Sequence, residues 1–155
     1  MLSRRTFLSQ AAALLGLVSG RRLLGVAGPG PRTPMTVYRS PSCACCAKWV
    51  DHVRANGFAA TVRDEPDQDA VKDRLGVPRG VRSCHTAQVG GYLIEGHVPA
   101  ADIRRVLRER PAVAGLAVPG MPVGAPGMEQ PGAAPEPYEV LAFARDGATR
   151  IYARH

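Results

Sequence analysis

The sequence predicts an α/β domain in which helices flank a mixed sheet, with a β-hairpin at the carboxyl end. Three observations support this prediction. A strand-like run, 35–38, leads into a loop with three cysteines, and an amphipathic run, 46–56, follows that loop. Further along, strand-like and helical runs alternate, separated by Gly and Pro. Near the end, two β-rich runs, 138–143 and 149–153, flank an Asp-Gly pair that is typical of a tight hairpin turn.

In the first half of the domain, helices and strands alternate. The first helix has a buried stripe formed by Cys46, Trp49, Val50 and Val53. We expect Ser42 to cap this helix and Gly57 to end it. Residues 58–63 are β-rich and form a second strand. A second helix starts at 64–66 and ends at Gly76, with a buried stripe formed by Ala70, Val71 and Leu75.

The second half begins with a hairpin. Two strand runs, 86–89 and 92–98, are joined by a Gly-Gly pair that favours a mirror-image turn. Pro99 opens a third helix and Pro111 ends it, with an inward face formed by Ile103, Val106 and Leu107. The order β-α-β-α-β-β-α, with the cysteine loop after the first strand, is that of the thioredoxin fold. We expect the final hairpin to extend the sheet or to cover the site, with the loop 112–137 crossing between.

The amino-terminal residues have the features of an export signal. Residues 3–8 match the twin-arginine pattern, and an apolar run, 11–18, follows them. This run is shorter than the roughly 20 residues that a membrane-spanning helix needs. We therefore expect a twin-arginine signal peptide at 1–27, a Pro/Gly linker at 28–34, and one periplasmic domain at 35–155 with no membrane anchor after signal removal.

The distribution of charge excludes one class of partner. The chain has 20 Lys and Arg against 13 Asp and Glu, a net charge of +7. Residues 1–27 hold four arginines and no acid, so the remainder has 16 minus 13, or +3. Because the remaining basic residues are spread among acidic ones, we expect no nucleic-acid partner.

The cysteines are the residues most informative about function. Cys43, Cys45 and Cys46 lie within four residues, and Cys84 stands beside His85 just before the third strand. Backbone N–H groups at a helix start stabilise the thiolate, which is both the nucleophile and the metal ligand. In the thioredoxin order, the turn before the third strand faces the start of the first helix. We therefore expect Cys84 to lie close to Cys43 or Cys46.

A third loop cysteine favours a soft-metal site. A thiol oxidoreductase needs one attacking and one resolving cysteine, so it has no use for Cys45. Met121 and Met128 lie among Pro and Gly, outside any apolar stripe, and thioether is a good ligand for Cu(I) but a poor one for Zn(II). Sulfur-rich ligation favours Cu(I), with Zn(II) and Cd(II) as rivals, and three or more thiolates can bridge several ions. Among the four histidines we favour His85 as a ligand.

Four motifs together resemble a known family. They are Tyr38 to Trp49, Ser83 to Thr86, Ile94 to Pro99, and Val118 to Pro122. As a set they resemble the CopG-type copper-resistance family of bacterial periplasmic proteins, from about residue 36 to the carboxyl end. The resemblance implies a thioredoxin-like domain that binds copper through the cysteine loop and the Cys-His pair. It also implies a role in copper handling, with copper redox chemistry as an extension of that role.

Three functions from different classes follow. The first is a periplasmic protein for copper handling or resistance that works with copper or redox proteins; its ligands would be Cys43, Cys45, Cys46, Cys84, His85, Met121 and Met128. The second is a thiol-disulfide oxidoreductase acting on periplasmic proteins, in which Cys43 attacks and Cys46 resolves. The third is a scaffold whose cysteines form structural disulfides. The sequence leaves open whether the protein is an enzyme.

Overall fold

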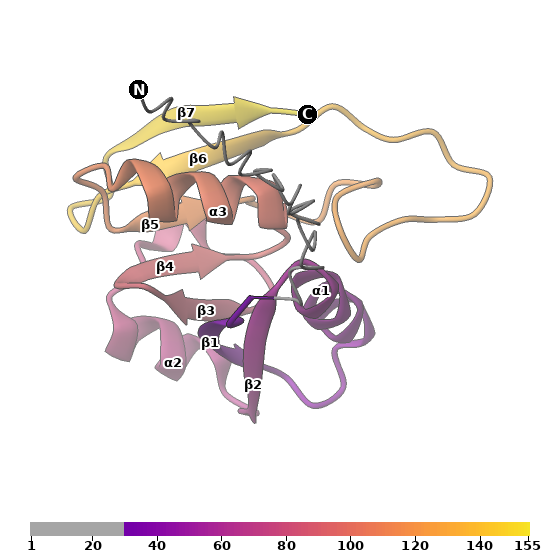
Figure 1. Ribbon diagram of the computed structural model, residues 1–155, viewed down its shortest axis with the longest axis horizontal. Helices are drawn as coiled ribbons and strands as arrows, with labels where there is room; N and C mark the ends of the chain where they lie inside the picture. Colours follow the sequence, from indigo (N-terminus) through magenta and orange to yellow (C-terminus); the bar gives the residue numbers. More distant parts are fainter. Residues whose placement is uncertain (1–29) are drawn as a thin grey trace, which may run out of the picture.

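The computed structural model describes residues 30–155, so the predicted signal peptide, 1–27, lies outside the described residues. In the described part, seven strands form one mixed sheet in the order β2-β1-β3-β4-β5-β6-β7 (Figure 1). Three α-helices flank the sheet, which confirms the predicted α/β class. No helix within residues 30–155 is long and apolar enough to cross a membrane.

The first strand lies inside the sheet. β1 (Thr33–Arg39) runs parallel to β2 (Phe58–Asp64) on one side and antiparallel to β3 (Thr86–Val89) on the other. β1 begins within the predicted linker, 28–34, because its first residues pair with the start of β2. The ladder between β1 and β3 has a consequence for the site: the turn before β3 lies beside the loop after β1.

β5 (Gly115–Ala117) is a strand that the sequence analysis missed, inside the predicted loop 112–137. It pairs parallel with β4 (Tyr92–Glu95) and antiparallel with β6 (Glu139–Phe143). All three of its residues are buried, so the sequence shows no alternation of polar and apolar positions. A side chain at Gly115 would collide with the backbone of β4, and therefore glycine is required there.

Both predicted hairpins are present. β3 and β4 are joined by the Gly-Gly turn, and β4 ends earlier than the predicted residue 98 because the chain turns at Gly96, which has a φ of 70°. β6 and β7 (Thr149–Arg154) form the carboxyl-terminal hairpin, with Gly147 in its turn at a φ of 92°. This hairpin extends the sheet, which is one of the two positions predicted for it.

The helices follow the predicted order. They are α1 (Ala44–Ala55), α2 (Gln68–Leu75) and α3 (Ala100–Glu109). α2 begins later than the predicted 64–66, because the side chain of Asp67 accepts a backbone N–H of the first turn at 2.9 Å. The order β-α-β-α-β-β-α up to α3 therefore agrees with the prediction, and the thioredoxin-like assignment stays a prediction.

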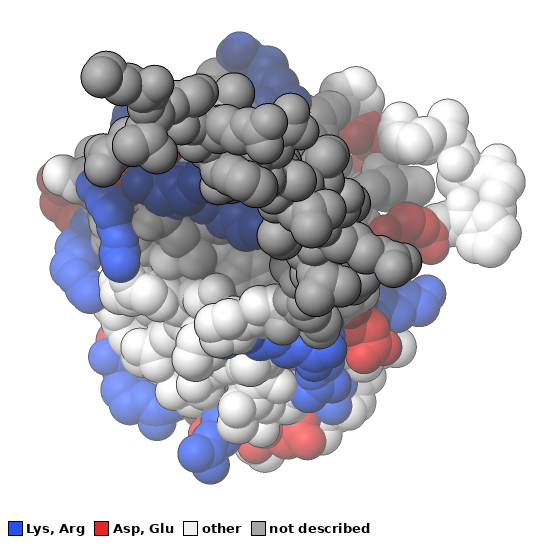
Figure 2. All heavy atoms as spheres, in the orientation of Figure 1, with Lys and Arg blue, Asp and Glu red and all other residues white. Residues whose placement is uncertain are grey.

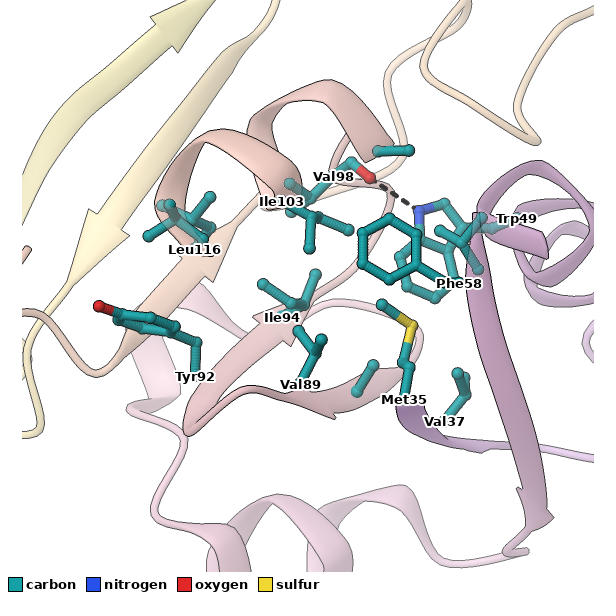
Figure 3. Close-up of a cluster of buried hydrophobic side chains, with 14 of the residues drawn as sticks. Met35, Val37, Trp49, Phe58, Val89, Tyr92, Ile94, Val98, Ile103 and Leu116 are labelled. Atoms are coloured by element: carbon teal, nitrogen blue, oxygen red, sulfur yellow. Dashed lines mark hydrogen bonds between the residues drawn. The ribbon is translucent and has the colours of Figure 1, made fainter. Parts of the chain in front are cut away.

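Two hydrophobic clusters cover the two faces of the sheet. The larger one packs α1 and α3 against one face and contains Trp49 and Phe58 (Figure 3). The indole N–H of Trp49 donates to the carbonyl of Val98 at 2.9 Å, which ties α1 to the segment before α3. The smaller cluster contains Phe143 and lies near the short 3-10 helix η1 (Arg79–Val81). Neighbouring residues of β4 alternate between the clusters, as in a strand buried on both faces.

The inner face of α2 differs from its prediction. Val71 is buried as expected, but Ala70 is exposed, and the buried neighbour is Lys72, which is only 2% exposed. The Lys72 ammonium donates to Glu95 Oε1 at 2.7 Å and to Thr86 Oγ1 at 3.0 Å. A charged side chain is rarely buried unless it is paired in this way. The pattern of apolar residues alone therefore could not reveal that Lys72 is buried.

The surface carries charges of both signs. On the face shown in Figure 2, Asp and Glu side chains stand among the Lys and Arg side chains. Ion pairs join several of the opposite charges, such as Arg39 with Asp64 at 3.1 Å and Arg154 with Glu139 at 3.1 Å.

Candidate metal centre

The loop between β1 and α1 positions the first three cysteines. Cys43, rather than the predicted Ser42, caps α1: its sulfur accepts the backbone N–H of Cys46 at 3.3 Å. Ser42 instead lies with its hydroxyl 3.1 Å from that of Ser40. The positive end of the α1 dipole is thus directed at a cysteine sulfur, which favours a thiolate at this position.

The four cysteines converge, although two of them are paired. Cys43 and Cys46 form a disulfide, with Cα atoms 5.3 Å apart, while Cys45 and Cys84 are free thiols. The Cys45 sulfur lies 3.4 Å from that of Cys43. All four sulfurs lie within 4.8 Å of one another, which confirms the predicted closeness of Cys84 to the loop. The expected set of four thiolates therefore exists only after the disulfide is reduced.

Strand pairing is what brings Cys84 to the loop. In the antiparallel ladder, Tyr38 at the end of β1 pairs with Thr86 at the start of β3. Cys84 stands two positions before Thr86, and the cysteine loop follows Tyr38 on the neighbouring strand. The two segments therefore leave the sheet side by side at the same end.

Two histidines approach the Cys84 sulfur. Nδ1 of His85 lies 3.2 Å from it, and Nε2 of His97 lies 3.1 Å from it. Nδ1 of His97 also lies 2.8 Å from the carbonyl oxygen of Pro126, which can only accept a hydrogen bond. Nδ1 therefore carries the proton, and the lone pair of Nε2 faces the sulfur, as in a metal-ligating histidine oriented by a second partner.

The sequence analysis did not favour His97 as a ligand, because its position near the end of a predicted strand is that of an ordinary structural residue. Its position within the motif Ile94 to Pro99 was the one signal for it. In the structure, one atom each from Cys84, His85 and His97 forms a second group of potential ligands within 4.8 Å. Cys84 belongs to both groups, and so it joins the sulfur cluster to the imidazole pair.

Burial keeps both imidazoles neutral. His85 is fully buried, with its ring centroid 4.4 Å from that of Trp49 and 5.2 Å from that of His97. Burial, together with the nearby His97 and Lys72, holds the pKa of His85 well below its usual range. Burial also lowers the pKa of His97. Nε2 of His85 is buried without a hydrogen-bond partner. Neutral imidazole is the form that binds metals.

The thiol of Cys84 is protonated in this state. Burial, with a further effect from Cys45, raises its pKa to about 12. A metal ion that binds the sulfur must therefore displace a proton, and so binding at Cys84 is expected to strengthen as the pH rises.

A carboxylate clamps the turn that carries Cys84 and His85. Glu95 Oε1 accepts the backbone N–H of Ser83 at 2.6 Å, and Oε2 accepts the hydroxyl of Thr86 at 2.6 Å. These two residues flank the Cys-His pair on either side. Burial raises the pKa of Glu95, and the ammonium of Lys72 opposes that effect. Sequence reasoning missed this residue because it reads as one more position of a strand.

The two predicted methionines lie at different openings of the centre. Met121 is 55% exposed and lines a cavity of 730 Å³ together with Cys84. Met128 is half-buried and lines a smaller cavity of 240 Å³ together with Cys45. Each methionine thus lines the same cavity as one of the two free cysteines.

The segment between β5 and β6 lies over the first turn of α1. A side chain at Gly127 would meet the backbone of α1, with Cβ 2.8 Å from the nitrogen of Trp49 and 2.9 Å from the carbonyl oxygen of Cys45. Gly127 also has a φ of 86°, so two independent reasons favour glycine. This contact brings the neighbouring carbonyl of Pro126 to His97.

The remaining histidines have structural partners. His52 is half-buried and accepts the backbone N–H of Ala100 at 3.1 Å, at the start of α3. His155 lies 2.7 Å from Asp102 and stacks on Tyr138.

Comparisons with known proteins agree with this geometry. The family described as "Protein of unknown function, DUF411" matches residues 81–128, which hold Cys84, His97 and both loop methionines. Two solved structures of a copper resistance protein, CopG, in forms 2 and 1, are each 47% identical to this chain, with TM-scores of 0.75 and 0.74. In each case the match covers 80% of this chain and 98% of the other. No curated protein matches the chain.

Proposed function

This chain belongs to the CopG family of copper resistance proteins, and on that premise we propose that it binds copper for copper handling or resistance. The observation that supports the proposal is that four cysteine sulfurs lie within 4.8 Å of one another. In addition, an imidazole nitrogen from each of two histidines lies close to the sulfur of Cys84. The proposed ligands are those of the two groups together: Cys43, Cys45, Cys46, Cys84, His85 and His97. Met121 and Met128 line the two openings and are left out of this set, so their predicted role as ligands stays a prediction.

The reduced protein is the proposed copper-binding form. Reduction of the Cys43–Cys46 disulfide requires two electrons and leaves four thiols in one place. A set of ligands rich in thiolate favours Cu(I). Zn(II) and Cd(II) also bind thiolate and would compete for the same ligands. Because Cys84 belongs to both ligand groups, its sulfur is suited to bridge two metal ions.

The same cysteines support a redox role for the bound cargo. If the thiolates of Cys43 and Cys46 each give one electron to a Cu(II) ion, the products are two Cu(I) ions and the disulfide seen in the structure. Cys45 and Cys84 remain as thiol ligands after that step. A cellular thiol-disulfide partner would return the two electrons, which fits the proposed redox partners.

We further propose that the protein acts in the periplasm, after export by the twin-arginine route. The Cys43–Cys46 disulfide supports this location, because disulfides persist in oxidising compartments and are rare in the cytosol. The export signal itself rests on the sequence pattern alone.

A competition titration tests the choice of metal. The anaerobically reduced protein is expected to bind Cu(I) at least as tightly as Zn(II), because thiolate ligands prefer the softer ion. Both affinities are measured under the same conditions with chromophoric chelators of known affinity. Displacement of bound Cu(I) by an equal concentration of Zn(II) would contradict the proposal.

A second function, thiol-disulfide exchange, is supported by the paired Cys43 and Cys46 at the start of a helix. Cys45→Ser distinguishes it from metal binding. Under the copper proposal, this variant loses Cu(I) affinity to a degree comparable with Cys46→Ser. Under the exchange mechanism, Cys45→Ser keeps disulfide reductase activity, whereas Cys43→Ser loses it. Measuring Cu(I) affinity and reductase activity on the three variants separates the two functions.

A further inference from the structure

A cavity of 730 Å³ opens beside the metal centre. It lies between the start of α2 and the two loops that carry Cys84 and Met121, with Lys72, Arg82 and Asp69 in its lining. Pockets of this size bind small molecules. Cys84, the residue that the two ligand groups share, also lines this cavity.

The walls of this cavity are held by polar contacts. Arg82 pairs with Asp69 at 3.2 Å, also pairs with Asp73, and donates to the carbonyl of Val77 at 3.1 Å. The hydroxyl of Ser83 donates to the carbonyl of Gly120 at 2.8 Å, so the residue before Cys84 is bonded to the residue before Met121. The two sulfur-bearing loops are therefore fixed to each other.

Met121 is a solvent-exposed hydrophobic residue in the lining of this cavity. It is 55% exposed, and in residues 30–155 it and Ile151 are the exposed large hydrophobic residues. Met121 stands at the cavity that contains a free thiol, and its thioether binds Cu(I) but not hard cations. The smaller opening at Cys45 differs, because its methionine, Met128, is half-buried and its cavity has only 240 Å³.

We propose that Met121 and Cys84 form a capture site that takes Cu(I) from a soft-ligand complex and passes it to the cysteine and histidine ligands. This proposal rests on the proposed function and deepens it. The step is a ligand exchange without change of oxidation state. The Met121 thioether binds the ion as the first ligand of the incoming soft-ligand complex leaves. The Cys84 thiol then loses its proton to solvent as the copper–sulfur bond forms, and the second ligand of the incoming complex leaves. Met121 takes part in the transfer and not in the final site.

The rate and the equilibrium of copper uptake test the proposal separately. Reduced full-length protein is mixed anaerobically with Cu(I) bicinchoninate, and the loss of the colour of this complex gives the rate of transfer. Equilibrium competition with the same chelator gives the affinity. Met121→Leu keeps the volume and apolar character of the side chain and removes its sulfur. Met128→Leu is the matched control at the other opening.

We expect Met121→Leu to slow the transfer about tenfold while the equilibrium affinity changes less than about twofold, because only the path is altered. Met128→Leu is expected to transfer copper at the wild-type rate. The proposal is overturned if Met121→Leu transfers at the wild-type rate, or if Met128→Leu slows it equally. It is also overturned if affinity and rate fall together, which would make Met121 a permanent ligand. Wild-type protein that takes up no Cu(I) would instead contradict the proposed function itself.

Discussion

Replacing Cys84 by serine is expected to lower the affinity of the reduced protein for Cu(I) by about 100-fold or more, since even residues that only orient metal ligands cost 10–100-fold. Cys84 is the one residue shared by the sulfur group and the histidine group. Serine keeps the approximate shape of the side chain but supplies a hard oxygen, which binds Cu(I) poorly. The number of copper ions bound should fall as well, because the link between the two groups is removed. Chelator competition measures the affinity, and elemental analysis measures the stoichiometry.

Ser83→Ala provides the control for this variant. It alters the adjacent residue and removes the hydrogen bond to Gly120, but it leaves every sulfur and imidazole in place. Its equilibrium affinity for Cu(I) should stay close to that of the wild type. If Cys84→Ser bound Cu(I) with the wild-type affinity and stoichiometry, the metal site would consist of the loop cysteines alone. The assignment of His85 and His97 as ligands would then be wrong.

Glu95→Ala is expected to destabilise the fold by about 3–5 kcal/mol, because it leaves the buried ammonium of Lys72 without its partner. The side-chain exposures of the pair are 3% for Lys72 and 0% for Glu95, so water cannot replace the lost contact. The same substitution removes the acceptor for the Ser83 N–H and the Thr86 hydroxyl, which hold the turn around Cys84. Urea unfolding of the variant at neutral pH gives the loss in the free energy of unfolding.

A double variant separates the loss of charge pairing from the loss of the clamp. In Lys72→Met with Glu95→Gln, no unpaired charge is buried, and the amide oxygen can still accept the Ser83 N–H. We expect this variant to recover more than half of the stability that Glu95→Ala loses, because replacing both members of a buried pair costs far less than removing one. Equal destabilisation of the two variants would show that the ion pair is not the cause. Copper affinity of the double variant should remain close to wild type if Glu95 acts by positioning the turn.

Local patterns were sufficient for most of the elements. The stripe of α1, the glycines of the two hairpins and the proline at the start of α3 depend on residues close in sequence, and the structure has these elements where they were expected. The cysteine loop and its neighbouring motifs likewise pointed to the CopG family without any coordinates.

The features that depend on distant residues were decided only by the tertiary structure. β5 forms because Gly115 fits against the backbone of β4, and a three-residue buried segment has no periodicity to reveal it. Lys72 is buried because a carboxylate 23 positions further along the chain reaches its ammonium. His97 joins the centre because a loop carbonyl 29 positions later orients its ring. Hydrophobic patterning reports which side of an element faces the core, whereas strand pairing and packing determine which side chains meet there. The sequence by itself thus determined which cysteines are the candidate ligands, and the folded chain decided that they meet and which polar groups lie beside them.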